Sequence, residues 1–260
     1  MPTYPQLGSG ALSQFPVQKT RRLRTVVNQA ADGSTIKLAD PAAEVTEWLL
    51  TYADLSDAEA AALRAFFNSA EGTLNGFTFL DPAGNLLAWS DQLDNAVWQK
   101  DPLLSLTGGV ADPLGGTLAW RLNNSGGAVQ GVGQTLAAPG EYLYCLSAYV
   151  RAATATSVGL TVGSHAAQRA VTSGWTRIAW TSNGDAQATS VRLAIAIGAG
   201  DVVEMFGLQV EAQAAASGYR ASTVGGVYED ARLGDDVLTI TSTDVNRNSC
   251  KVKIIHANHL

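Results

Sequence analysis

The chain has 260 residues, of which 46% are hydrophobic and only 15% are charged, with a formal net charge of −6. An average soluble domain carries about 25% charged residues, so this composition suits close-packed β structure with small side chains on its outer faces. It excludes a disordered chain and argues against nucleic-acid binding, and no run approaches the ~20 apolar residues of a membrane span.

The N-terminal part predicts two strands, residues 19–27 and 35–38, joined by a turn at residues 31–34. Pro41 is expected to break the chain after them, because proline cannot donate a ladder hydrogen bond. Residues 1–5 do not suit a regular strand and are interpreted as an arm that reaches a neighbour. The first strand carries a basic run, which consists of Lys19, Arg21, Arg22 and Arg24. We expect it to form an assembly contact, since arginine is favoured at interfaces. A solvated strand edge that discourages unwanted pairing is the alternative.

Residues 44–52 alternate, which predicts a half-buried strand whose apolar side consists of Thr46, Trp48, Leu50 and Tyr52. A helix follows, with Ser56 as N-cap and Glu59 three residues later, the pattern of a capping box. Its apolar face is predicted to contain Ala60, Leu63, Phe66, Phe67 and Ala70. Gly72 ends the helix, and a further strand places Phe77 and Phe79 on one side. A short helix is not stable alone, so strand, helix and strand should pack as one unit.

From residue 85 to about residue 223 short β-prone runs alternate with Gly, Asn, Ser and Pro turns. The candidate strands are residues 118–122, 142–151, 157–162, 175–181, 191–197 and 202–210. This pattern predicts an antiparallel sandwich of the jelly-roll type. Residues 237–243 and 249–256 then predict a hairpin that returns to the first sheet. The predicted fold is therefore mainly β: a small module with one short helix, residues 1–84 plus 224–260, interrupted by a jelly-roll domain, residues 85–223.

Catalytic or metal-binding residues are not evident. Cys145 and Cys250 fit no metal-ligand spacing. Cys145 lies in an apolar run and is predicted to be a buried thiol. The three histidines, His165, His256 and His259, lack ligand spacing. A group of carboxylates, Asp91, Asp94, Asp101 and Asp112, suggests either a calcium site or, in preference, a solvated acidic loop. We predict no enzyme activity and no cofactor.

The segment EVTEWLLTYADLSDAEAAALRAFFNSAEGTLNGFTFLDP resembles the N-terminal module of tailed-phage minor tail and distal tail proteins. The resemblance covers roughly residues 17–82, and residues 237–256 look like the closing hairpin of the same module. The resemblance depends on three features in this order: an extended strand, a short helix with paired phenylalanines, and a following strand with the sequence F-x-F-x-D-P.

The second part resembles the carbohydrate-binding-like jelly roll that is common in phage tail and fibre proteins. The opening NLLAWSDQLDNAVWQK and the later segments CLSAYVRA, GWTRIAW and FGLQVEAQAAASGYRAST carry this resemblance in the expected order. It spans nearly all of residues 85–223.

Together, the two resemblances imply a virion protein of the tail tip, made in the host cytoplasm. A distal tail protein forms a ring, usually sixfold, that joins the tail tube protein to the baseplate hub. In that arrangement the first module would build the ring and the jelly roll would project outward. The second hypothesis is an adhesin that binds host surface glycans. The third, a glycan-degrading enzyme, lacks a paired-carboxylate cleft that is readable in the sequence.

Carbohydrate sites often offer an aromatic face to a sugar ring. The candidate glycan contacts are Trp89, Trp120 and Trp180. Trp175 lies five positions from Trp180, so the two should face opposite sides of one strand, and at least one should pack in the core. Trp98 is interpreted as structural. If the domain binds no glycan, it would be a rigid spacer or a contact for neighbouring tail proteins.

Overall fold

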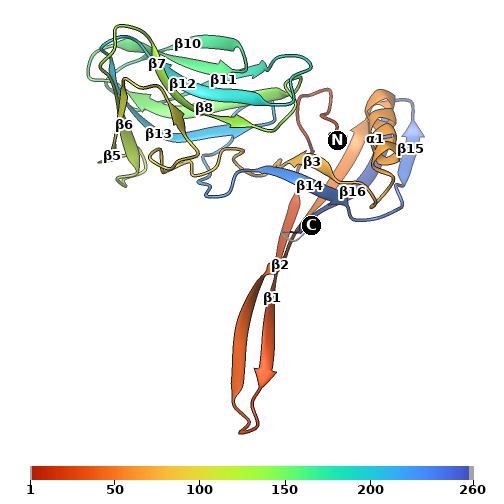
Figure 1. The fold of residues 1–260 in the computed structure, drawn as a ribbon. Coiled ribbons are helices and arrows are strands. Elements are labelled where there is room, and N and C mark those ends of the chain that lie inside the picture. Colours follow the sequence, from red (N-terminus) through yellow and green to blue (C-terminus); the bar gives the residue numbers. More distant parts are fainter. Residues whose placement is uncertain (1, 258–260) are drawn as a thin grey trace. The chain divides into compact units, whose positions relative to one another are not determined.

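The computed structural model describes residues 2–257 of the chain. These residues are mainly β with one short helix, as predicted. The chain divides into two compact units (Figure 1). Unit 1 comprises Met1–Gly8, Leu12–Phe79 and Tyr228–Leu260, and unit 2 comprises Ser9–Ala11 and Leu80–Val227. The limits predicted for the inserted domain, residues 85 and 223, both fall inside unit 2.

Unit 1 contains a six-stranded sheet in the order β1-β2-β16-β14-β3, with β15 paired to β16. Its strands are β1 (Gln18–Gln29), β2 (Thr35–Leu55), β3 (Phe77–Leu80), β14 (Val227–Leu233), β15 (Ile240–Asp244) and β16 (Arg247–Ala257). β16 pairs antiparallel with β2, so the two ends of the sequence share one sheet, as expected. The predicted C-terminal hairpin is formed by β15 and β16. β14 was not predicted.

The single helix of the described residues, α1 (Asp57–Ala70), begins and ends as the sequence indicates. The Ser56 side chain accepts from the Glu59 N–H, and the Glu59 side chain accepts from the Ser56 N–H, which confirms the capping box. Glu71 takes a left-handed conformation, with φ 52°, and ends the helix just before Gly72. The helix buries Ala60, Leu63, Phe66 and Ala70, whereas Phe67 is only half-buried.

Tyr4 is part of the core of unit 1. Its ring is 1% exposed, and its ring centroid lies 5.1 Å from that of Phe66 and 5.6 Å from that of Phe79. Its hydroxyl forms a 2.7 Å hydrogen bond with the hydroxyl of Tyr52. The prediction that residues 1–5 reach a neighbour is therefore wrong for Tyr4, because this large ring fills the space between the helix and the sheet. On β2, the predicted apolar side is confirmed, since Trp48, Leu50 and Tyr52 are buried.

β1 and β2 extend beyond the rest of the unit 1 sheet as a hairpin, here called the arm (residues 23–44; Figure 1). β2 pairs with β16 only from Val45 onward, so the arm has no third strand. The prediction that Pro41 breaks the chain is wrong. Pairing passes from Arg22↔Val45 to Arg24↔Asp40 across an irregularity that contains the proline. A bulge requires no ladder N–H from proline, so β2 continues through it.

Unit 2 contains two five-stranded antiparallel sheets, as the sandwich prediction requires. The β9 sheet has the order β10-β9-β12-β7-β4, with β4 (Gln99–Lys100), β7 (Gln130–Leu136), β9 (Thr156–Val162), β10 (His165–Val171) and β12 (Val191–Ile197). The β8 sheet has the order β11-β8-β13-β6-β5, with β5 (Leu104–Val110), β6 (Ala119–Asn124), β8 (Leu143–Arg151), β11 (Thr176–Asn183) and β13 (Val202–Glu211). The six predicted strands correspond to β6, β8, β9, β11, β12 and β13. The others were missed because their sequences are short or rich in glycine and polar residues.

The β8 sheet has an inner and an outer face. Leu122, Val150 and Met205 are fully buried on the inner face, which belongs to the core of the sandwich. On the outer face the segment 212–222 folds back over the sheet. Gln209 accepts from the Arg220 N–H at 2.7 Å, and Glu211 accepts from the Ser217 N–H at 2.9 Å. This segment covers one part of the outer face and thereby determines where a ligand can approach it.

Candidate functional site

A row of side chains crosses the outer face of the β8 sheet. Arg151 on β8 and Arg121 on β6 both lie opposite Glu204 on β13, and Thr107 on β5 lies opposite Arg121. These residues alternate with buried neighbours such as Val150 and Val203. Because successive side chains of a strand point to opposite faces, the row points away from the sandwich core. We call Arg151, Glu204, Arg121 and Thr107 the cross-sheet row.

Glu204 lies at the centre of the cross-sheet row and accepts from both guanidinium groups. Arg121 Nη2 lies 2.7 Å from Glu204 Oε1, and Arg151 Nε lies 2.6 Å from Glu204 Oε2. Partial burial raises the pKa of the Glu204 carboxyl, but the hydrogen bonds and charges of Arg121 and Arg151 outweigh it and bring the pKa below its usual value. The Glu204 side chain is 15% exposed and that of Arg121 is 54% exposed, so the carboxylate is held in place while the arginine stays accessible.

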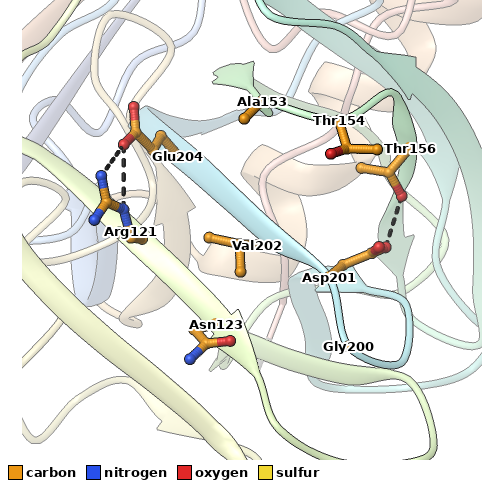
Figure 2. Close-up of a pocket in the computed structure, with 9 residues that line it drawn as sticks. All are labelled: Arg121, Asn123, Ala153, Thr154, Thr156, Gly200, Asp201, Val202 and Glu204. Atoms are coloured by element: carbon orange, nitrogen blue, oxygen red, sulfur yellow. Dashed lines mark hydrogen bonds and ion pairs between the residues drawn. The ribbon is translucent and has the colours of Figure 1, made fainter.

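A hollow of about 580 Å³ lies beside the cross-sheet row (Figure 2). Nine residues line it: Arg121, Asn123, Ala153, Thr154, Thr156, Gly200, Asp201, Val202 and Glu204. All belong to unit 2. Arg121 and Glu204 are at one end of the hollow, while Thr156 and Asp201 are at the other. The hollow therefore combines cationic, anionic, amide and hydroxyl groups from β6, β9, β13 and the adjoining loops.

The Asp201 end of the hollow is fixed by a network of hydrogen bonds. Thr156 Oγ1 donates to Asp201 Oδ2 at 2.6 Å, and the Gly198 N–H donates to the same oxygen at 3.1 Å. The buried Asn124 holds the turn at residues 198–201, because its Nδ2 donates to the Gly198 carbonyl at 2.7 Å. Gly200 has φ +74°, a conformation that glycine adopts without strain. The turn is thus preorganised before any ligand arrives.

An aromatic side chain continues the cross-sheet row. The Arg151 guanidinium lies over the Trp175 ring, with 4.7 Å between Cζ and the ring centroid. Trp175 is half-buried and precedes β11. As expected, the two tryptophans lie on opposite sides: Trp175 contacts Arg151 of the outer face, whereas Trp180 lies opposite Leu146 on the inner side, and both are half-buried. Trp175 was not proposed as a glycan contact, since its position relative to Arg151 depends on strand pairing that the sequence does not display.

The three tryptophans proposed as glycan contacts do not line this hollow. Trp120 is half-buried, and its Nε1 donates to the Asp91 carbonyl at 3.0 Å. Trp180 on β11 is half-buried opposite Leu146, on the side of the strand that belongs to the inner face. Trp89 lines a different, smaller hollow. Trp98 is 6% exposed, and its Nε1 donates to the Trp89 carbonyl at 3.0 Å.

The basic run of β1 has partners within unit 1. Arg21 pairs with Glu44, Arg22 Nη2 lies 2.8 Å from Glu47 Oε2, and Arg24 Nε lies 3.6 Å from Asp40 Oδ2. Lys19 Nζ lies 5.3 Å from the Trp48 ring centroid and 5.6 Å from that of Tyr228. The three arginine side chains remain about two-thirds exposed, at 64%, 67% and 66%. Exposed ion pairs of this kind contribute little to stability. Because their side chains are largely exposed, the arginines are accessible to a partner.

Other titratable residues take structural positions. Cys145 and Cys250 are both buried and free. His165 Nδ1 lies 3.2 Å from the Asn183 carbonyl, and His256 packs against Tyr228, whereas His259 lies outside the described residues. Of the four carboxylates considered for calcium, Asp91, Asp101 and Asp112 accept protein hydrogen bonds. Within residues 2–257 no group of three or more His, Cys, Asp or Glu is suited to hold a metal ion. In the same range, no helix has the length and apolar character to cross a bilayer.

No protein-family model and no curated protein matches the chain. Solved structures similar to part of it include the enzymatically active domain of tailspike protein 4 of bacteriophage CBA120, with 14% identity, 50% of this chain and 22% of that chain covered, and a TM-score of 0.39. The CBM22-1 xylan-binding domain of Paenibacillus barcinonensis Xyn10C has 16% identity, 51% and 97% coverage, and a TM-score of 0.42. TmCBM61 in complex with β-1,4-galactotriose has 13% identity, 49% and 98% coverage, and a TM-score of 0.37. Each likeness concerns about half of this chain and assigns neither family nor ligand to it.

Proposed function

We propose that unit 2 binds carbohydrate in the hollow beside the cross-sheet row. The observation that carries this proposal is the arrangement of Arg121, Glu204 and Arg151 next to the Trp175 ring, on an accessible part of the β8 sheet. A second candidate function, assembly through unit 1, is supported by a different observation, the exposed arm.

The chemistry of the hollow suits a sugar. Sugar hydroxyls both donate and accept hydrogen bonds, and the hollow offers donors from Arg121 and Asn123 and carboxylate acceptors from Asp201 and Glu204. Several of these groups are already fixed by bonds within the protein, so little side-chain freedom is lost on binding. Trp175 provides an apolar ring beside the polar groups, the combination typical of small-molecule sites. A glycan chain that crosses the strands would contact both.

The proposal is binding without bond cleavage. Glycoside hydrolysis generally uses two carboxyl groups, one of which must be protonated to act as an acid. Glu204 is paired with two arginines that lower its pKa, and Asp201 is bonded to Thr156 and to the Gly198 N–H. Both carboxylates are thereby used to hold side chains and a turn. We expect no release of reducing ends from any polysaccharide that binds.

Titration of the full chain with soluble plant and bacterial polysaccharides, followed by calorimetry and by the indole N–H signals of the labelled protein, tests the proposal. Binding should shift the Trp175 signal and be lost in Arg121→Ala and in Trp175→Ala. Lys100→Ala, an exposed cation of the β9 sheet, is the matched control and should bind normally. Absence of binding across the panel, or binding that Arg121→Ala leaves unchanged, contradicts the proposal.

Second, we infer that unit 1 is an assembly module. The arm supports this inference, because it exposes Ile36 and Leu38 on one face and Val27 on the other, each more than half exposed. Opposite one another on one face of the arm lie Val26 and Leu38, followed by Asn28 and Ile36. An isolated two-stranded hairpin is marginally stable in water. Contact with a second copy would bury this apolar side and stabilise the arm.

The form of assembly we propose is the one implied by the sequence resemblance: a ring, usually sixfold, at a phage tail tip, between the tail tube protein and the baseplate hub. Glycan binding by unit 2 would then serve attachment of the virion to its host. Sedimentation velocity of the full chain over a range of concentrations tests the contact. Self-association should be lost in Ile36→Ser/Leu38→Ser and retained in the control Gln29→Ser/Thr35→Ser, on the other face of the arm. A chain that stays monomeric throughout, or a double variant that still associates, contradicts it.

A further inference from the structure

A second hollow, of about 210 Å³, lies elsewhere on unit 2. Trp89, Asp91 and Gln92 line it from the opening segment of the unit, and Ala221, Ser222 and Thr223 line it from the closing segment. Its volume is below the ~300 Å³ at which typical pockets for drug-sized ligands begin. The hollow is therefore suited to a small group. From this hollow we propose a second carbohydrate site, one that takes a single neutral sugar residue such as a chain end.

The two segments that line the hollow are bonded directly to each other. The Ser90 N–H donates to the Ser222 carbonyl at 2.9 Å, and the Ser222 N–H donates to Ser90 Oγ at 2.9 Å. Ser222 Oγ also donates to the Leu87 carbonyl at 2.5 Å. The position of the hollow's two sides is therefore fixed without a ligand, which reduces the entropy lost on binding.

Trp89 is held in a conformation that a bulky residue rarely adopts. Its φ is +50°, in the left-handed region, where an L side chain is strained. The Trp89 carbonyl accepts from Trp98 Nε1 and from the Gln92 N–H, each at 3.0 Å. These bonds hold the strained backbone of Trp89, a residue that lines the hollow. Strain of this kind concentrates at ligand sites, where the surroundings compensate for it.

The polar groups of the hollow can bind sugar hydroxyls while the indole contacts the apolar face of the ring. Tyr219 donates its hydroxyl to Asp91 Oδ1. Burial, together with the adjacent carboxylate, raises the pKa of Tyr219 above its usual value, so it remains a neutral donor. This bond orients the carboxylate, while the 3.0 Å bond from Trp120 Nε1 to the Asp91 carbonyl holds the backbone. Among the described residues Asp91 Oδ2 accepts no hydrogen bond, so we infer that it accepts from the ligand. Gln92 is exposed and adds an amide with both donor and acceptor atoms.

This inference does not depend on binding at the cross-sheet row, and the two sites have separate reporters. The chain has six tryptophans, each with one indole N–H signal. Trp89→Phe and Trp175→Phe assign the two signals that matter in the ¹⁵N-labelled full chain. The probes are the methyl α- and β-glycosides of glucose, galactose, mannose, xylose and N-acetylglucosamine, titrated to high millimolar concentration.

At least one glycoside should shift the Trp89 signal in a saturable way. Gln92→Ala removes one neutral hydrogen bond from an exposed side chain and should weaken this binding about two- to tenfold. Asp91→Asn removes the negative charge of the carboxylate that would accept from the sugar, and it should weaken binding of the glycoside at least as much as Gln92→Ala does. Arg121→Ala, at the other hollow, is the control and should leave the Trp89 response unchanged.

Two results would overturn the inference. One is the absence of any saturable shift of the Trp89 signal by all ten glycosides. The other is a Trp89 shift whose midpoint is the same in wild type, Gln92→Ala and Asp91→Asn, which would reflect a nonspecific effect of the sugar. Because the Trp175 signal reports independently on the larger hollow, failure here remains distinct from failure of the proposed polysaccharide binding.

Discussion

Arg151 links an aromatic ring to a carboxylate: its guanidinium lies 4.7 Å above the Trp175 ring centroid while its Nε donates to Glu204 at 2.6 Å. Glu204 accepts from Arg121 as well, so one carboxylate orients side chains from two neighbouring strands. The position of the accessible Arg121 therefore depends on the negative charge of Glu204.

Glu204→Gln should weaken polysaccharide binding about tenfold, because both ion pairs are lost and the single amide oxygen can accept from only one of the two guanidinium groups that Glu204 holds. Isothermal titration calorimetry of the full chain measures this change. Glu141→Gln replaces an exposed glutamate of the same unit and should bind like the wild type. Equal affinities for Glu204→Gln and wild type would show that the carboxylate does not orient the site.

The same carboxylate makes stability dependent on pH. Its pKa is below the ordinary value of 4.5, so its contribution to the free energy of unfolding is fully present above about pH 4.5. That contribution is lost as the pH falls through the folded-state pKa, because protonation then favours the unfolded chain. Urea unfolding of wild type and Glu204→Gln should show a stability difference at pH 7 that shrinks below pH 4.5. A difference that is constant between pH 7 and pH 3 would contradict the assignment.

Both thiols should resist modification in the folded chain. Cys145 is 1% exposed and Cys250 is 7% exposed. Burial raises the pKa of both, that of Cys250 to about 11, so the reactive thiolate is scarce at pH 8. A thiol reagent such as Ellman's should react slowly with the native chain and with two thiols per chain in denaturant. Cys145→Ala and Cys250→Ala isolate each thiol, and rapid reaction of either in the native state would be incompatible with its burial.

Ser56→Ala should destabilise unit 1 by about 1 kcal/mol, because it removes the hydroxyl that accepts from the Glu59 N–H at the start of α1, while the backbone N–H of residue 56 can still donate to Glu59. Hydrogen exchange of the α1 amides measures this loss within unit 1. The matched control is Ser69→Ala, near the end of the helix, whose hydroxyl donates to the Phe66 carbonyl. Similar exchange rates in the two variants would show that the cap contributes no more than an ordinary helix serine.

Local patterns in the sequence were sufficient for much of the fold. The alternation that ends in Trp48, Leu50 and Tyr52 predicts β2, and Ser56 with Glu59 predicts the start of α1, since each signal depends on residues close in sequence. Strands β5 and β7 were missed because Gly108, Gly109, Gly131 and Gly133 interrupt their β-prone residues.

The candidate site was not predicted because it depends on pairing between distant strands. Arg121 and Arg151 are 83 and 53 positions from Glu204, and only the register of β6, β8 and β13 brings the three together. In the sequence each appears as one charged residue within an apolar run, as expected for an outward-facing strand position. The large number of tryptophans in residues 85–223 led to the choice of Trp120 and Trp180 as candidates. Trp175 differs from them only in its contact with Arg151, which the sequence does not display.

The position of β16 between β2 and β14 also has a consequence for synthesis on the ribosome. Both sheets of unit 2 are translated between β2 and β16, so they have all their strands before unit 1 has its central one. The usual order, in which N-terminal structure forms first, is therefore reversed here. Until β16 emerges, the edge of β2 that pairs with β16 has no partner strand, and an unpaired edge favours aggregation.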